Sequence, residues 1–242
     1  MNYGAGGSEG IVILQIVASH FPRLHSLTVS VSYPSSAEAD ADLTAFAEKC
    51  PQLEELSLTS QQLTDQSVIA LAQHCSRLKK LKLYHCKLTA ASLIALSECG
   101  LPLEKLDISS IPISSAEIAA QCAHVLSRIR GLFKMSHSDT TTYLRYVIQY
   151  MTGLCELNLG NSDDHLLVPH LLLLLQGQCC AGLETLTIWY GSSITPQQVG
   201  ELVAVCPHLH TLQISKPTCN SNTVLVELAR SCPHLQKVSL DR

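Results

Sequence analysis

The sequence has few aromatic residues, little net charge and no long apolar run. Its 242 residues include one tryptophan and three phenylalanines, and the formal net charge is −4. So small a charge does not create the field that recruits nucleic acid or an acidic membrane surface. The densest apolar run, residues 166–175, includes Pro169 and His170. It is too short to cross a bilayer, which takes about 20 residues, so we expect neither nucleic-acid nor membrane binding.

Familiar enzyme motifs are also missing. The sequence contains no H-E-x-x-H and no Walker loop, which would have indicated a metalloprotease or a nucleotide-binding protein. Residues 4–10 are rich in glycine, but they do not fit G-x-G-x-x-G and no strand precedes them. We therefore expect a protein that is not an enzyme and needs no cofactor.

The first ten residues do not resemble an export signal. Residues 1–10 include Glu9 and neither lysine nor arginine, whereas a secretory signal starts with a basic region. We expect residues 1–10 to form a flexible leader. Eleven cysteines are present, but the number is odd and their placement is periodic, which favours small apolar core positions over disulfides. Both features favour the reducing cytoplasm or nucleus.

What the sequence does contain is a repeated motif. Cys50–Leu58 and Cys206–Ile214 share the pattern C-P-x-L-x-x-L-x-L/I, and weaker copies fill most of the chain. Intervals between copies are 24 to 29 residues, which is typical of leucine-rich repeats. The nine copies have as their first position Leu24, Leu53, Leu78, Leu103, Arg130, Leu154, Leu183, Leu209 and Leu235.

Within each copy the hydrophobic period changes from that of a strand to that of a helix. Leu81 and Leu83 alternate with polar residues and predict a short strand, whereas residues 88–96 follow helical spacing. Thr89 or a neighbour is expected to cap that helix, and Asp65 the helix one copy earlier. Stacked copies predict an α/β leucine-rich-repeat solenoid over residues 11–242, a horseshoe with a parallel sheet on its concave side and helices on its convex side.

The fifth copy departs from the motif and allows two registers. One register starts at Arg130 and turns Phe133 and Met135 inward, and the other starts at Ile129 and turns Lys134 inward. We prefer the first, because burying a lysine costs more than exposing Leu132.

The motif resembles the cysteine-containing leucine-rich repeats of the ribonuclease-inhibitor-like superfamily. A cysteine three residues before the first leucine is typical of that family, and Leu63-Thr64-Asp65 is similar to its helix entry. The cysteines in that position are Cys50, Cys75, Cys180, Cys206 and Cys232. The resemblance extends to the repeat arcs of eukaryotic F-box/LRR substrate receptors and of antagonist-of-mitotic-exit-network proteins. It implies an arc that holds a protein substrate or partner; we expect no F-box in this chain.

Residues that alternate with the core leucines should form what we call the open face, the side of the sheet away from the helices. Nine strands about 4.8 Å apart would give this face a length of about 40 Å, enough for a protein partner. Trp189 should lie exposed on it beside Tyr190, and exposed aromatic residues are favoured binding anchors. It could instead lie flat over its neighbours and shield the strand. The complete set of expected contact residues is Trp189, Tyr190, Tyr84, Lys80, Lys82, Lys105, Asn158 and Asn161.

Two other patterns on this sequence have simpler explanations. The lysines near Tyr84 suggest a basic patch, but Glu55 and Asp107 should flank Lys80 and Lys82, and opposite charges on adjacent strands stabilise a sheet. His208 and His234, with Cys206 and Cys232, resemble a zinc set. The cysteines should point inward and the histidines outward, so we expect no metal site.

The sequence therefore predicts a non-enzymatic scaffold that binds a protein partner on the open face. The resemblance supplies an alternative, substrate recognition within an SCF-type ubiquitin ligase. A second alternative is a structural element: no polar capping unit follows the last copy, so that end could stack on another chain or on a further copy of itself.

Overall fold

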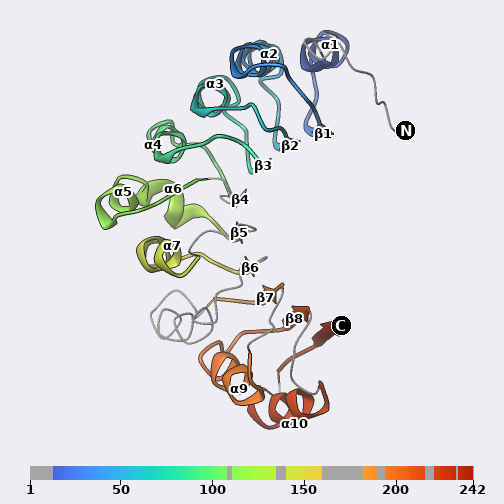
Figure 1. Ribbon diagram of the computed structural model, residues 1–242, viewed down its shortest axis with the longest axis vertical. Helices are drawn as coiled ribbons and strands as arrows, with labels where there is room; N and C mark the ends of the chain where they lie inside the picture. Colours follow the sequence, from blue (N-terminus) through green and yellow to red (C-terminus); the bar gives the residue numbers. More distant parts are fainter. Residues whose placement is uncertain are drawn as a thin grey trace. The chain divides into compact units, whose positions relative to one another are not determined.

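The computed structural model describes residues 13–107, 111–134, 140–159, 182–189, 194–215, 221–232 and 234–241. The chain divides into two compact units, residues 1–103 with 110–112, and residues 104–109 with 113–242. In each unit the strands lie side by side and the helices cover one side of them (Figure 1). The predicted leader, residues 1–10, lies outside the described residues.

The first unit alternates helices and strands. Its elements are α1 (Ile13–His20), β1 (Ser26–Ser30), α2 (Ser36–Lys49), β2 (Glu55–Thr59), α3 (Asp65–His74), β3 (Lys80–Tyr84) and α4 (Ala90–Glu98). Strands β1, β2 and β3 pair in parallel, and equivalent leucines fall in register, as in the pair Leu56 and Leu81. Those two leucines are 1% exposed. A fully buried leucine stabilises a fold by about 2 kcal/mol relative to an exposed one.

The second unit continues the same pattern. Its elements are β4 (Lys105–Asp107), α5 (Ala116–Gln121), α6 (Ala123–Arg128), β5 (Gly131–Lys134), α7 (Thr140–Val147), the 3-10 helix η2 (Ile148–Tyr150), β6 (Glu156–Leu159), β7 (Thr185–Ile188), α9 (Pro196–Ala204), β8 (Thr211–Ser215), α10 (Ser221–Ser231) and β9 (Lys237–Asp241). Strands β4 to β9 pair in parallel in sequence order. The described residues thus form nine parallel strands, one for each predicted copy.

Our preferred register for the fifth copy is wrong. Leu132 pairs with Leu106 on one side and Leu157 on the other, and it is completely buried. Ile129 is also completely buried and occupies the first motif position in place of Arg130, which is exposed. Burial of these two aliphatic side chains decides the register, and Lys134 pairs with Leu159 at the end of the strand.

Of the two helix caps that the sequence suggested, one is correct and the other is shifted by one residue. Thr89 caps α4, as predicted, but Thr64 rather than Asp65 caps α3. The Asp65 carboxylate instead accepts hydrogen bonds from the backbone N–H (2.8 Å) and hydroxyl (2.6 Å) of Thr89, and from the Ser92 hydroxyl. Asp65 of α3 therefore holds the start of α4, the helix of the next repeat.

Three of the five periodic cysteines fill the core, as predicted: Cys50, Cys75 and Cys206 are completely buried. Cys232 is half-buried, and Cys180 lies outside the described residues. The Cys75 thiol lies 3.8 Å from the Ala47 carbonyl oxygen and 3.7 Å from that of Cys50. Burial, with a smaller contribution from Cys50, raises the pKa of Cys75 to about 12. These are inert packing residues.

Among the described residues, we find no helix with the length and apolar character needed to span a membrane.

Candidate functional site

The open face of the first unit carries polar side chains with charges that are largely matched. Every second residue of β2 and β3 is half-buried between buried leucines. Lys80 pairs with Glu55 on the neighbouring strand, Nζ to Oε1 2.5 Å, and Lys79 pairs with Glu54 at 2.8 Å. The predicted neutralisation of Lys80 is therefore confirmed. Exposed pairs of this kind contribute little stability, but they remove most of the positive field that the lysines suggest.

In the second unit, an ion pair spans three strands. Lys105 of β4 binds Glu156 of β6, and Gly131 of β5 lies between them. A Cβ at Gly131 would lie 3.1 Å from Lys105 Cγ and 3.4 Å from a carboxylate oxygen of Glu156. Absence of a side chain at Gly131 is thus what lets the two charges meet. Because our preferred register put Leu132 in this position, the sequence did not predict this pair.

Trp189 follows β7 and is 40% exposed. Its backbone N–H donates to the Leu159 carbonyl (2.8 Å), and its indole Nε1–H donates to Asn158 Oδ1 (2.9 Å). Asn158 pairs with Thr187 across β6 and β7, so the indole reaches back over the neighbouring strand. Trp189 therefore has a fixed orientation and an exposed surface at once.

Thr187, in the middle of the same face, is buried rather than solvent-facing. It is 4% exposed, and its hydroxyl donates to Gln213 Oε1 of β8 at 3.2 Å. We attribute its burial to the hydrogen-bonded side chains of Asn158 and Gln213 on either side and to the nearby indole. The face is consequently well ordered across β6, β7 and β8.

The remaining predicted residues are spread over both units. Tyr84 and Lys82 lie on β3, paired with Thr59 and Ser57 of β2, and both are half-buried. Asn158 and Trp189 lie in the second unit, where a hydrogen bond joins them. Tyr190 and Asn161 lie outside the described residues.

The suggested zinc set is partly separated as the sequence predicted. Cys206 is buried and Cys232 is half-buried, whereas His208 and His234 are exposed. In the described part of the chain, no cluster of three or more histidine, cysteine or acidic residues is placed to hold a metal ion.

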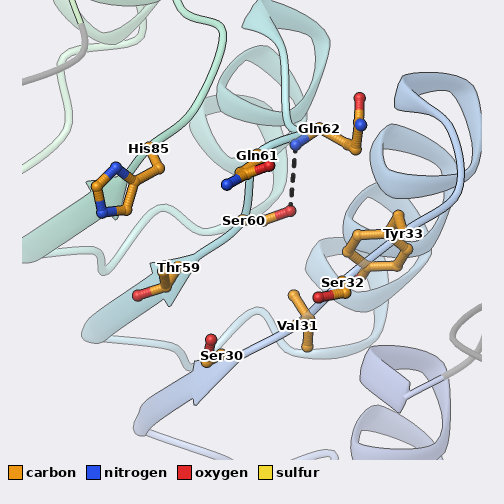
Figure 2. A pocket seen from close by; sticks show the side chains of 9 residues that line it. All are labelled: Ser30, Val31, Ser32, Tyr33, Thr59, Ser60, Gln61, Gln62 and His85. Carbon is orange, nitrogen blue, oxygen red and sulfur yellow. Dashed lines mark hydrogen bonds between the residues drawn. The ribbon is translucent and has the colours of Figure 1, made fainter. Parts of the chain in front are cut away.

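A pocket in the first unit was missed from the sequence. It has a volume of about 260 Å³ and lies beyond the ends of β1 and β2 (Figure 2). The lining residues are Ser30, Val31, Ser32, Tyr33, Thr59, Ser60, Gln61, Gln62 and His85. Ser30 and Thr59 are also the last open-face residues of their strands. The signal that could have revealed it is the run of small polar residues and glutamines after successive strands.

Comparison with known proteins supports the fold. No protein-family model matches the chain. F-box/LRR-repeat protein 4 of Bos taurus is 32% identical over 104 residues, which is 41% of this chain and 16% of that protein. Rad7, solved in complex with Elc1 from yeast, matches 95% of this chain and 62% of its own, with a TM-score of 0.62 and 16% identity. An internalin of Listeria monocytogenes matches 95% of this chain and 63% of its own, with a TM-score of 0.46 and 19% identity.

The matches to Rad7 and to F-box/LRR-repeat protein 4 confirm the leucine-rich-repeat fold that the sequence predicted. The chain spans less than two thirds of the Rad7 chain and about a sixth of the curated relative. Its fold is established by the repeat and by the match to Rad7.

Proposed function

We propose that this leucine-rich-repeat protein is a non-enzymatic scaffold that binds a protein partner on the open face of its sheet, in the cytoplasm or nucleus. The observation that carries the proposal is Trp189, 40% exposed and held by its hydrogen bond to Asn158. Large side chains that are already ordered lose little entropy on binding, and tryptophan is enriched among the residues that dominate binding energy.

The charges of the open face favour a contact made mainly by aromatic and hydrogen-bonding groups. Lys80 and Lys105 are each paired with a glutamate on the same sheet. A partner that used these lysines would have to break or share those pairs, so we assign them to the rim of the contact together with Lys82. In the second unit, Asn158 and Trp189 form its centre, and we extend that surface to Tyr190 and Asn161. In the first unit, Tyr84 is a contact on the open face.

The experiment compares Trp189→Ala with the wild-type chain. Affinity capture and mass spectrometry identify the partner, and its affinity for the purified variants is then measured. We expect Trp189→Ala to weaken binding roughly 30-fold, as for a residue worth about 2 kcal/mol. Phe21→Ala is the matched control, since Phe21 is 59% exposed and lies after α1. Equal loss from both variants, or none from Trp189→Ala, contradicts the proposal.

Substrate recognition in an SCF-type ubiquitin ligase is the second candidate. Its support is the similarity to F-box/LRR-repeat protein 4 over 104 residues. If it holds, the adaptor that binds F-box proteins should be captured with this chain and lost on washing with a competing F-box peptide. Repeated capture without any such adaptor argues against this function.

Stacking on another chain is a third candidate, supported by apolar exposure at the last described repeat. Leu225 and Val226 of α10 are 46% and 52% exposed, and Val238 of β9 is 37% exposed. Sedimentation should then show association that rises with concentration and is abolished by Val226→Asp. A monomer at all concentrations rules it out.

A further inference from the structure

The pocket of the first unit has polar walls whose hydrogen-bonding groups are not used within the protein. The walls come from the ends of β1 and β2 and from the loops that follow β2 and β3 (Figure 2). Among the described residues, the side chains of Ser30, Ser32, Thr59, Gln61 and His85 have no hydrogen-bond partner. These groups include both donors and acceptors, and they are available to an occupant.

The floor of the pocket is apolar and rigid. Val31 is 4% exposed and Tyr33 is 6% exposed. The Tyr33 hydroxyl donates to Asp42 Oδ2 at 2.8 Å, so its polar end is engaged and its ring is what remains to line the pocket. Asp42 in turn accepts from the backbone N–H groups of Leu14 and Gln15 at 3.2 and 3.1 Å, which fixes the floor to α1.

The walls are also held in place. The Ser60 backbone N–H donates to the Tyr84 carbonyl (3.1 Å), and the Val31 N–H donates to that of Thr59 (3.0 Å). His85 has φ of 60°, a left-handed conformation that is uncommon for a residue with a side chain. Such conformations persist where the surroundings enforce them, and they are frequent at binding sites.

Among the described residues that line the pocket, none carries a carboxylate, ammonium or guanidinium group. Lys87, the nearby lysine, donates to Gln62 Oε1 at 2.8 Å, and that oxygen also accepts from Ser36 at 3.2 Å. A charged occupant would therefore give up hydration without gaining a counter-charge, which is costly. A neutral hydrogen-bonding group meets no such penalty.

We propose that this pocket receives a neutral polar side chain of the partner, of the asparagine or glutamine type, together with its adjoining backbone amide. The proposal rests on the proposed function, because the occupant belongs to the protein bound on the open face. The volume of about 260 Å³ is below the range of about 300–1,000 Å³ for pockets that hold whole small molecules. Continuity with the open face at Ser30 and Thr59 would let one residue of the partner enter while the rest lies on the sheet.

The test needs no partner and uses two probes that differ in charge. The isotope-labelled full chain is titrated with N-acetyl-asparagine N-methylamide and with its aspartate counterpart, and backbone amide shifts are followed by NMR. For so small a probe we expect a Kd of about 1 mM for the asparagine form, with shifts confined to residues 30–33, 59–62 and 85. The aspartate form should bind at least tenfold more weakly.

Variants with a matched control locate the effect. Gln61→Glu should weaken binding of the asparagine probe, because it removes the amide N–H donor of Gln61 and leaves only acceptors. Gln66→Glu makes the same change on an exposed residue of α3 outside the pocket and should leave binding unchanged. His85→Gly removes the imidazole at a backbone conformation that glycine adopts freely, so weaker binding there cannot be ascribed to strain.

Three results overturn the proposal: equal or tighter binding of the aspartate probe, shifts outside the pocket, or equal effects of Gln61→Glu and Gln66→Glu. None of them bears on Trp189. Failure of the pocket proposal is thus distinguishable from failure of the proposed function, which Trp189→Ala tests.

Discussion

At the scale of single residues, two aspartates show how successive repeats are joined. Asp40 accepts from the backbone N–H (3.0 Å) and hydroxyl (2.7 Å) of Thr64 and from the Ser67 hydroxyl (2.5 Å). Asp65 makes the equivalent bonds one repeat later. Ala90 occupies the next equivalent position, so α4 does not extend this series.

Asp65→Ala should lower the free energy of unfolding by about 2 kcal/mol, because hydrogen bonds to a charged acceptor contribute more than neutral ones. Gln66→Ala, at the next and exposed position of the same helix turn, should change it by less than about 0.5 kcal/mol. Urea denaturation of both variants measures the difference. Similar losses in the two variants would show that the aspartate does not link the repeats.

The stabilisation by Asp65 should also depend on pH. Burial raises the pKa of this carboxyl, but hydrogen bonds from Ser92 and Thr89 outweigh it and hold the pKa below its usual value. With the folded pKa below the unfolded one, the contribution is complete above the ordinary carboxyl pKa and is lost as pH falls through the lowered value. The difference in unfolding free energy between wild type and Asp65→Ala should therefore narrow as pH falls below the ordinary carboxyl pKa; a constant difference would contradict this.

Cysteine reactivity should follow burial. Cys99 is exposed, whereas Cys75 and Cys122 are buried, and burial raises their pKa values to about 12 and 11. Because the thiolate is the reactive form, alkylation of the native chain should label Cys99 well before those two. Peptide mass spectrometry after timed labelling reads the order. Early labelling of Cys75 would contradict its place in the core.

At the scale of elements, the strands and their neighbours were predictable from the spacing of leucines, and the register of β5 was not. The first motif position there holds Arg130 in one of the two possible registers. That register exposes Leu132, whereas the other turns Lys134 inward, so each carries one unfavourable side chain. Rules about single side chains therefore favoured the wrong choice. The two strands that flank β5 decide the register, because Leu106 and Leu157 must both face Leu132.

Substitutions in β5 distinguish the two registers. Leu132→Ala should cost about 3 kcal/mol, since Leu132 is completely buried. Phe133→Ala should cost less, because Phe133 is half-buried on the opposite face of the strand. Thermal or urea unfolding of the two variants compares them. A greater loss from Phe133→Ala would restore the register that the sequence favoured.

At the scale of the whole molecule, the repeat architecture followed from sequence because one motif recurs nine times. The regular spacing of its copies predicts a strand at the same place in each repeat. Function is less evident at this scale. Trp189 was identified as a candidate by its place in the repeat, but its hydrogen bond to Asn158 depends on side-chain conformations that periodicity does not specify. The pocket was missed for a similar reason: it is lined by loop residues, which follow no period.

Site-specific photo-crosslinking tests the central claim, that a protein partner lies on the open face. A photoreactive residue is placed at Ser57 or Thr185 on the open face, which leaves Trp189 in place, and at Gln66 or Ala91, exposed on helices α3 and α4. The account predicts adducts with the same protein from Ser57 and Thr185 and none from Gln66 or Ala91. Adducts formed from the helix positions, with none from Ser57 and Thr185, would contradict it.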